Sequence, residues 1–297
     1  MLSVLIPVKD WNPVSLVEFL IAQLIRCGKP FEILVSDDSP PGESLKISHL
    51  LNHVPAVKYF CRDQPLGRSA NRNFLGEQAN YEFLLFIDGD AGAGDENYIK
   101  NYLDRLSSDT VLCGGTGYYP EPPQNPDYLL RWKYGRAREQ VDALIRQKHP
   151  WKSFSTFNFL IPAKVFQSIR FDETIKGYGH EDTVFGIHLQ QAGIKILHLN
   201  NSLIHLGLEA STIYLDKTRE SGANLCLLYS RGVFPTTYTG EIKLLNSWTK
   251  LKKLHLSGIM AAWFRYRRKY IEIRLCGPNP SLFLLDLYKL GSISHIG

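Results

Sequence analysis

The feature that most constrains the fold is an alternation of strand-like and helix-like segments over about the first 90 residues. Four short runs are apolar and rich in β-branched or aromatic residues, as buried parallel strands are: 2–8, 31–38, 57–61 and 81–90. The segments between them have helical spacing, near 15–27, 43–52 and 67–79. This order predicts an α/β fold with an open, mostly parallel sheet covered by helices.

The remainder of the chain is less regular. We expect helices at 127–147 and 182–193, a strand, a turn and a helix at 154–169, and shorter strands at 110–119, 194–199 and 202–207. The proline-rich stretch 120–128 is expected to be a loop. Apolar residues recur at helical spacing from 241 to 270, with Lys and Arg between them. We therefore predict one domain in residues 1–230 and a mostly helical extension in residues 231–297.

Charge and cysteine content limit the environment in which the chain works. Residues 231–297 carry 11 Lys and Arg against three Asp and Glu, so the basic character belongs to the extension. The five cysteines are dispersed and form no CxxC pair, which argues against a disulfide framework and a zinc ribbon. The N-terminus does not resemble a signal peptide, and no apolar run is long enough to span a bilayer. These features predict a cytoplasmic protein.

Two carboxylates follow the fourth strand in the motif "IDGD". Alternation along a strand places Asp88 and Asp90 on the same side, where they repel each other unless a cation lies between them. Oxygen ligands of this kind suit Mn²⁺ or Mg²⁺ with positions left open for phosphate oxygens. Ligands of open parallel sheets sit at the carboxyl ends of the strands, where Asp37 and Asp38 also lie. The alternative is a solvated acidic loop.

A second group of polar residues lies in "KGYGHEDTVFGIHLQQAG". Glu181 and Asp182 stand at the start of a predicted helix, after a glycine-rich turn. A carboxylate there can cap the helix, or it can act as a general base for an acceptor hydroxyl, for which Asp182 is the better candidate. His205 follows on a short strand and is either a core histidine or a partner of Asp90.

Two arginines lie at helical spacing in "GRSANRN". Arg68 and Arg72 could both approach a diphosphate from one helix face. The alternative is that they form a solvated helix face.

Taken in order, these motifs resemble the family 2 glycosyltransferases, which are inverting enzymes with the GT-A fold. The resemblance covers roughly residues 2–228. It is carried by "LSVLIPVKD", "ILVSDDSP", "PLGRSANRNFLG", "LLFIDGDA", "FNFLIPAKVF" and "FDETIKGYGHEDTVFGIHLQQAG". The last segment is similar to the Gly-Trp-Gly-x-Glu-Asp region of the β-1,4-galactosyltransferase and polypeptide N-acetylgalactosaminyltransferase groups.

The resemblance implies a nucleotide pocket at the first two strands. Pro7 and Val8 would line it through backbone groups, and Asp38, with Asp37 beside it, would bond a base expected to be uracil. Arg72 would help to close the pocket.

The resemblance also implies a metal site and a catalytic pair. Asp88 would contact the ribose and the metal, and Asp90 and His205 would bind Mn²⁺ or Mg²⁺. Asp182 would be the base, and Glu181 would hold hydroxyls of the acceptor or the sugar.

Two further residues are implied to lie near the donor, Asn158 and Tyr178. Tyr178 stands where the family has tryptophan, which bears on the acceptor platform. Lys9 and Asp10 replace the family's aromatic residue and asparagine after the first strand, which removes the tyrosine that would stack on the base.

The expected activity is transfer of a hexosyl or N-acetylhexosaminyl group from a nucleotide sugar, expected to be a UDP-sugar, to an acceptor hydroxyl. The acceptor would be a saccharide or a lipid-linked saccharide, in bacterial-type polysaccharide or glycolipid synthesis. The alternatives are a nucleotidyltransferase acting on sugar phosphates and a non-catalytic nucleotide-sugar binding protein. "IPVKDWNP" has no glycine, which argues against a nucleotidyltransferase phosphate loop.

The basic segment 241–270 has two interpretations. It either packs on the catalytic domain or makes a peripheral contact with an anionic membrane, at the inner face of which the protein would then sit. Nucleic acid is not expected as a partner, because no RNA- or DNA-binding motif accompanies the charge.

Overall fold

The computed structural model describes residues 1–40, 42–235, 238 and 240–296, and it divides into two compact units. The first unit comprises Met1–Tyr118, Glu139–Thr174 and Glu181–Gly207. The second comprises Tyr119–Arg138, Ile175–His180 and Leu208–Gly297. Both units are therefore built from separate stretches of sequence.

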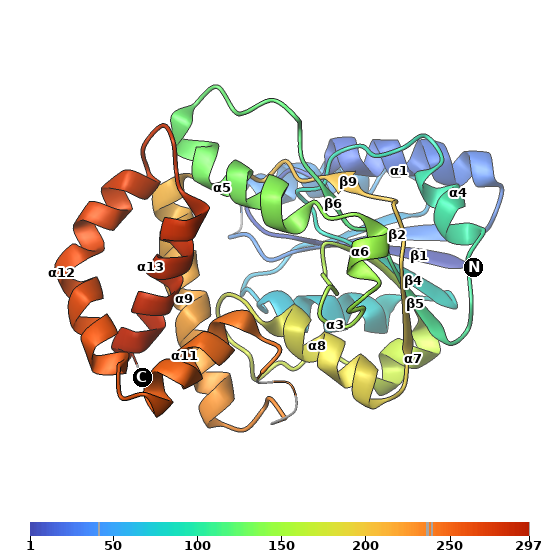
Figure 1. The fold of residues 1–297 in the computed structure, drawn as a ribbon. Helices are drawn as coiled ribbons and strands as arrows, with labels where there is room; N and C mark the ends of the chain where they lie inside the picture. The colour runs from blue at the N-terminus through green and yellow to red at the C-terminus, as the bar shows by residue number, and fades with distance from the viewer. Residues whose placement is uncertain (41, 236–237, 239, 297) are drawn as a thin grey trace. The chain divides into compact units, whose positions relative to one another are not determined.

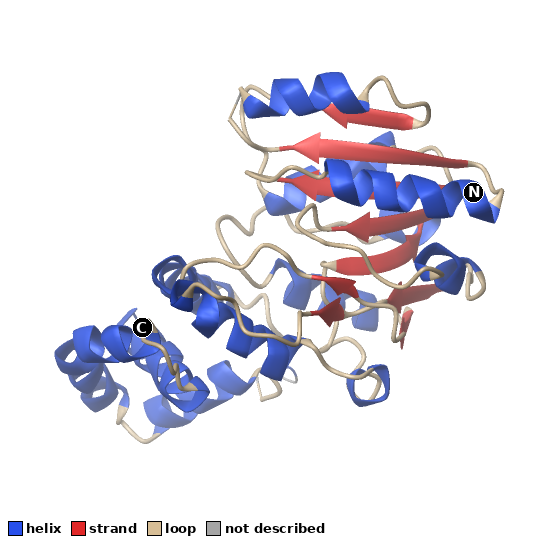
Figure 2. Cartoon of the chain, turned by 90° about the horizontal axis from the view of Figure 1, so that it is seen from above, coloured by secondary structure: helices blue, strands red, loops and turns tan. Residues whose placement is uncertain are grey.

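A mixed sheet forms the centre of the first unit (Figures 1 and 2). Among the described residues it has seven strands, in the order β3-β2-β1-β4-β7-β5-β8. Their bounds are β1 Leu2–Val8, β2 Phe31–Asp37, β3 Val57–Phe60, β4 Phe83–Ile87, β5 Thr110–Cys113, β7 Asn158–Pro162 and β8 Lys195–His198. β1 pairs in parallel with β2 and β4, and β7 runs antiparallel to both of its neighbours, β4 and β5. A two-stranded sheet is formed by β6 (Thr116–Gly117) and β9 (Leu203–Ile204).

Helices cover both faces of this sheet. Figure 1 shows α1 (Val14–Cys27) and α4 (Tyr98–Leu103) over one face, and α3 (Arg68–Gln78), α7 (Ala163–Ser168) and α8 (Glu181–Gln191) over the other. Helix α2 (Glu43–Leu51) contacts β3, and the short α6 (Ala143–Arg146) contacts β8. The sheet is thus enclosed on both sides, as its apolar strands require.

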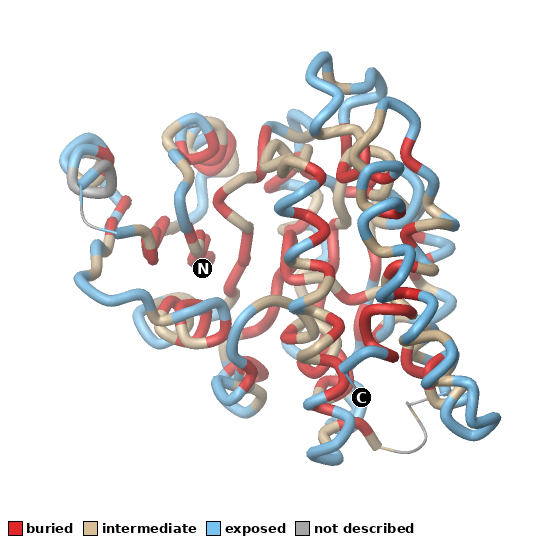
Figure 3. Tube along the Cα trace, turned by 90° about the vertical axis from the view of Figure 1, so that its left-hand side faces the viewer, coloured by how far each residue is buried: buried red, intermediate tan, exposed pale blue. Residues whose placement is uncertain are grey.

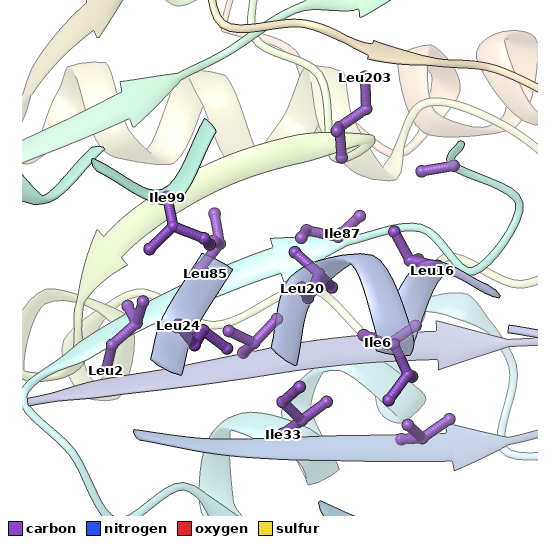
Figure 4. Packing of buried hydrophobic residues seen from close by; sticks show 14 of the residues in the cluster. Leu2, Ile6, Leu16, Leu20, Leu24, Ile33, Leu85, Ile87, Ile99 and Leu203 are labelled. Atoms are coloured by element: carbon purple, nitrogen blue, oxygen red, sulfur yellow. The ribbon is translucent and has the colours of Figure 1, made fainter. Parts of the chain in front are cut away.

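The core between the sheet and α1 follows from the apolar spacing of that helix. Leu16, Leu20 and Leu24 recur every four residues, so they share one face and pack on Ile6 and Ile33 of the sheet (Figure 4). The helix ends where Gly28 adopts a left-handed conformation with φ of 62°. Figure 3 shows the strands as mostly buried segments, whereas the helices alternate between buried and exposed residues.

Phenylalanines fill the opposite face of the sheet. Phe86 of β4 stacks on Phe159 of β7 at 4.9 Å between ring centroids, and Phe171 stacks on Phe185 of α8 at 4.2 Å. Phe166 of α7 contacts three of these rings. This cluster fixes α8 against the sheet, and with it the residues at the start of α8.

The second unit is helical. Its described helices include η1 (Pro126–Tyr128), α5 (Leu129–Tyr134), α9 (Ser211–Ser230), α11 (Lys243–Lys253), α12 (Ser257–Leu275) and α13 (Leu282–Ile296). The five-residue η2 (Gly135–Glu139) follows α5. Helix α13 packs on both α12 and α9, around a core that includes Leu130, Tyr214, Phe264, Leu275 and Tyr288. Gly291 allows the close approach of α13 to α12, since a Cβ there would lie 2.5 Å from the Phe264 ring.

The structure confirms the predicted mostly parallel sheet with a helical extension and corrects three details. The helix expected over 241–270 is broken, because His255 has a φ of 56° and the amide of Leu256 donates to the carbonyl of Leu251, which ends α11. The helix expected over 127–147 is split into η1, α5, η2 and α6. β4 ends at Ile87, so Asp88 and Asp90 lie in a turn rather than on the strand.

The domain boundary at residue 230 stays a prediction. Helix α9 lies on the N-terminal side of that boundary and packs on α13 on the other side. Within the described part of the chain, no helix combines the length and the apolar character needed to cross a membrane.

Candidate active site

The carboxyl ends of β1, β2 and β4 are joined by backbone hydrogen bonds. The amide of Asp38 donates to the carbonyl of Val8 at 2.9 Å, and the amide of Gly89 donates to the carbonyl of Pro7 at 3.1 Å. Gly89 is required by this approach, because a Cβ there would lie 2.8 Å from the Val8 side chain. The backbone groups predicted to line a nucleotide pocket therefore hold three strand ends together.

The two aspartates at the carboxyl end of β2 are buried and hold neighbouring loops. Asp37 accepts hydrogen bonds from the Tyr59 hydroxyl and from Ser39. Asp38 accepts from the amides of Leu66 and Gly67, at 3.2 and 2.8 Å. Burial raises the pKa of Asp38, while these amides act in the opposite direction. The carboxylate of Asp38 thus anchors the loop that leads into α3.

Asp88 is paired with an arginine of α3. Nη2 of Arg72 lies 2.6 Å from Oδ1 of Asp88, and the arginine side chain is almost fully buried. Burial raises the pKa of Asp88, Arg72 acts against this, and the nearby charge of Asp90 adds to the rise. Asp88 and Asp90 therefore repel each other as the sequence predicted, but a guanidinium already compensates one of them.

Asp90 is brought next to His205 by a short antiparallel alignment. Ala91 and His205 form a bridge, the amide of Leu206 donates to the carbonyl of Asp90 at 2.9 Å, and the amide of Gly92 donates to the carbonyl of Ile204 at 2.6 Å. This register places Nε2 of His205 3.4 Å from Oδ2 of Asp90.

The chemistry of this pair fits a divalent cation. A carboxylate oxygen and an imidazole nitrogen are both ligands of Mn²⁺. Donor atoms 3.4 Å apart can share one ion, because ligands of one small cation lie about 3 Å from each other. Among the described residues, no group of three or more His, Cys, Asp and Glu side chains is arranged to hold a metal. A metal-binding role of Asp90 and His205, with Asp88 as a third ligand, therefore stays a prediction.

Glu181 and Asp182 occupy the first turn of α8, and their pKa values are shifted in opposite directions. Nη1 of Arg68 lies 3.4 Å from Oε1 of Glu181. Burial acts to raise the pKa of Glu181, but Arg68 and Arg72 outweigh it, so the pKa is lowered. Burial and the charge of Glu181 raise the pKa of Asp182 to about 6, against hydrogen bonds from Thr183. Near pH 7 the pair thus holds a firmly charged carboxylate beside a more basic one.

These residues form one charged network in the first unit. Arg72 binds Asp88 and also acts on the pKa of both Glu181 and Asp182, and Arg68 joins Glu181 to the same network. The arrangement links the turn after β4 with the start of α8, although these segments are far apart in the sequence.

The side chain of Asn158 is held within the core. Its side chain is 1% exposed. Its amide oxygen accepts from the hydroxyls of Tyr98 and Tyr102, and its amide nitrogen donates to the carbonyls of Gly115 and Asn201. All hydrogen-bonding positions of this amide are used, so we leave Asn158 out of the donor contacts proposed below.

Tyr178 belongs to the second unit, in the segment Ile175–His180. Helix α9 holds this segment. Glu220 accepts from the amide of Tyr178, and Asn224 donates to the carbonyls of Lys176 and Tyr178. Gly177 has a φ of 77°, and a Cβ there would lie 2.3 Å from the Glu220 carboxylate, which explains the glycine. A contact of Tyr178 with the donor stays a prediction.

Several residues outside the predicted motifs also shape the site. Phe157 and Tyr118 place their rings 5.5 Å from the His205 ring, between centroids. Gly207 leaves room for Asp90, because a Cβ there would lie 2.1 Å from its Oδ2. Gly207 could have been found from its position two residues after His205. The sequence spacing of Phe157 and Tyr118 gives no indication that they lie near the site.

The fold is that of the GT-A enzymes. The model of the family "Glycosyl transferase family 2" matches residues 3–169, more than half of the chain. This chain belongs to glycosyl transferase family 2.

Solved structures agree with this fold. The mannosyltransferase PcManGT from Pyrobaculum calidifontis, in complex with GDP-Man and Mn²⁺, aligns with a TM-score of 0.60 and 12% identity over 99% of this chain and 86% of that chain. S. aureus TarS aligns with a TM-score of 0.50 and 19% identity over 82% of this chain, but the match spans only 45% of the TarS chain. At these identities the likeness shows the fold alone. A search of curated proteins found no match.

Proposed function

We propose that this protein is an inverting glycosyltransferase with Asp182 as its base. It moves a hexosyl or N-acetylhexosaminyl group from a nucleoside diphosphate sugar, with UDP preferred, to a hydroxyl of a saccharide or a lipid-linked saccharide. The setting would be the synthesis of a bacterial-type polysaccharide or glycolipid in the cytoplasm.

One arrangement carries the proposal: Glu181 and Asp182 lie side by side in the first turn of α8, with Nη1 of Arg68 3.4 Å from Oε1 of Glu181. Two neighbouring carboxyl groups whose environments separate their pKa values are suited to different roles. The pKa of Glu181 is lowered by arginines, which suits a permanent negative charge that holds hydroxyls. The pKa of Asp182 is raised to about 6, so near pH 7 it is ionised and more basic than an ordinary aspartate.

In this mechanism Asp182 takes the proton of the acceptor hydroxyl while the anomeric carbon is attacked in a single displacement. Arg68, which is partly exposed and lies beside Glu181, would approach the diphosphate. Asp38 and the strand ends at Pro7 and Val8 would face the nucleoside, with Asp37 as support and Arg72 holding Asp88 in place.

Asp90 and His205, with Asp88 as a predicted third ligand, would hold Mn²⁺ or Mg²⁺, whose charge stabilises the departing diphosphate when it is bound. The Mn²⁺ complex of PcManGT, which shares this fold, supports a metal in such a site. The GDP-Man in that complex supports a nucleoside diphosphate sugar as the donor class. Whether the nucleobase of the donor is uracil or guanine is left to experiment.

The direct test of the reaction is a panel of UDP- and GDP-sugars with Mn²⁺ and simple saccharide acceptors. We expect release of nucleoside diphosphate from one class of donor, and NMR of the product should show the anomeric configuration inverted. Retention of configuration would contradict the single displacement. Release of a sugar 1-phosphate would indicate nucleotidyl transfer, and binding without turnover of any donor would indicate a binding protein.

Removal of the metal tests the proposed ligands separately from catalysis. We expect EDTA to abolish transfer and added Mn²⁺ to restore it. Binding of Mn²⁺, measured by electron paramagnetic resonance, should weaken by at least roughly 10- to 100-fold in Asp90→Asn and in His205→Ala, because each variant removes a proposed ligand. The matched control Asp63→Asn, at an exposed aspartate, should bind Mn²⁺ normally. Full activity in EDTA would contradict a role for the metal.

A further inference from the structure

Helix α12 carries apolar side chains on two faces, although it packs on other described helices with only one of them. Phe264, Ile271 and Leu275 are buried and form part of the core of the second unit. Their spacing of seven and four residues places them on one side of the helix, toward α13. This face accounts for the folding of α12.

The outer face of α12 consists of five exposed side chains. They are Ile259, Trp263, Tyr266, Tyr270 and Ile273, which are 68%, 36%, 83%, 57% and 71% exposed. Their spacings of four, three, four and three residues keep them in one stripe along the helix, because a turn takes 3.6 residues. We refer to these five residues as the outer stripe. A continuous exposed row of this size in a folded protein marks an interaction surface.

Basic residues lie on both sides of the outer stripe. On a helical projection, Arg265 and Lys269 fall on one flank, and Arg267 and Arg274 fall on the other, and all four are exposed. The single acidic residue of α12, Glu272, is instead engaged by Arg219, Arg268 and the hydroxyl of Tyr288. The exposed surface around the stripe is therefore positive without compensation from α12 itself.

The neighbouring helix continues the same pattern. α11 ends with Lys250, Lys252 and Lys253 in its last turn. The exposed Leu254 and Leu256 follow at the break between α11 and α12. Apolar and basic side chains thus recur together along this part of the chain.

We propose that the outer stripe of α12 binds the surface of an anionic lipid bilayer, with the helix lying in the plane of the interface. Trp and Tyr favour the boundary between headgroups and acyl chains, isoleucines enter the apolar layer, and flanking Arg and Lys pair with lipid phosphates. A second copy of the chain fits less well, because two such basic faces repel each other. The proposal goes beyond sugar transfer and does not depend on it.

Sedimentation with vesicles tests the proposal. The full chain should bind vesicles of phosphatidylcholine mixed with phosphatidylglycerol, bind poorly to phosphatidylcholine alone, and lose binding at high salt. The variant Trp263→Ser/Tyr266→Ser/Tyr270→Ser should lose binding by at least roughly tenfold. The variant Arg265→Gln/Lys269→Gln should bind roughly 25-fold more weakly, since each basic residue near a charged surface contributes about a factor of five.

Matched controls separate this surface from general stickiness. Ile25→Ser/Leu144→Ser removes two other exposed apolar side chains, and Lys29→Gln/Lys164→Gln removes two other exposed charges. Both control variants should bind vesicles like the wild type. Circular dichroism checks that every variant is folded.

A spectroscopic readout locates the contact independently of affinity. Vesicles should shift tryptophan emission to shorter wavelength in the wild type, and the shift should disappear in Trp263→Phe while sedimentation persists. Equal pelleting of the wild type and the outer-stripe variant would overturn the proposal. The proposal would also be overturned if the wild type does not bind vesicles but forms dimers, and the outer-stripe variant abolishes those dimers. The stripe would then bind a second copy of the chain.

Discussion

At the scale of single residues, the surroundings of Glu181 and Asp182 give the two carboxyl groups different pKa values. Arg68 stands beside Glu181 and lowers its pKa together with Arg72. Asp182, one position later, is half-buried, and desolvation together with the charge of Glu181 raises its pKa to about 6. Two adjacent carboxyl groups thereby acquire the different proton affinities that a hydroxyl-holding group and a base need.

This separation predicts a specific pH dependence of transfer. If Asp182 must be ionised, kcat/KM should fall about tenfold per pH unit below a pKa near 6. Glu181→Gln removes the negative neighbour that raises the pKa of Asp182, so the acidic limb should move to lower pH even though the rate falls. The matched control Asp63→Asn should leave the limb unchanged. A limb that stays in place in Glu181→Gln would contradict this account.

At the scale of elements, α8 is placed by an aromatic cluster rather than by its own amphipathicity. Phe185 lies one turn after Glu181 and is almost fully buried against Phe171 and Phe154. Phe159 of β7 also contacts it. The first turn of α8, with its two carboxylates, is therefore positioned by a ring that packs on the sheet.

Phe185→Ala should reduce both stability and activity. Loss of a buried phenylalanine costs about 3–5 kcal/mol of the free energy of unfolding, and the shift of α8 should lower kcat in the protein that remains folded. Denaturant unfolding and assays at low temperature measure the two effects. Phe283→Ala, at an exposed phenylalanine, should change the free energy of unfolding by less than about 0.5 kcal/mol. A Phe185→Ala protein as stable as the wild type would contradict the role of the cluster.

At the scale of the whole molecule, the sequence predicted the sheet and most of the residues around its carboxyl edge. The alternation of apolar runs and helical spacing is a local signal, so β1, α1 and β2 were predicted within about a residue of their bounds. The residues alone left His205 open between a core histidine and a partner of Asp90, and only the family resemblance favoured the second, because a pairing across more than a hundred residues has no local signal.

Other features could not be predicted because they depend on tertiary contacts. The burial of Asn158 between Tyr98 and Tyr102 is set by the packing of α4 on the sheet, which spacing does not reveal. The helix break at His255 requires a positive φ at that residue, and a histidine in the sequence does not indicate where a helix ends. The pairing of Arg68 with Glu181 joins α3 to α8 and likewise has no pattern in the sequence.

The central claim is that Asp182 accepts the proton of the acceptor in this first-unit site. The measurement is the rate of sugar transfer by wild type and Asp182→Asn with the donor saturating. Burial raises the pKa of Asp182, so its ionisation costs stability as pH rises from about 4 to 6. Asp182→Asn should therefore be about 1–3 kcal/mol more stable than the wild type near pH 7, with the difference vanishing below pH 4. That gain would exclude misfolding as the cause of a lost rate.

We expect kcat to fall by roughly 10²- to 10⁴-fold in Asp182→Asn, with donor affinity unchanged within about twofold. Asp63→Asn should transfer sugar at the wild-type rate. A wild-type rate in a folded Asp182→Asn protein would contradict the account.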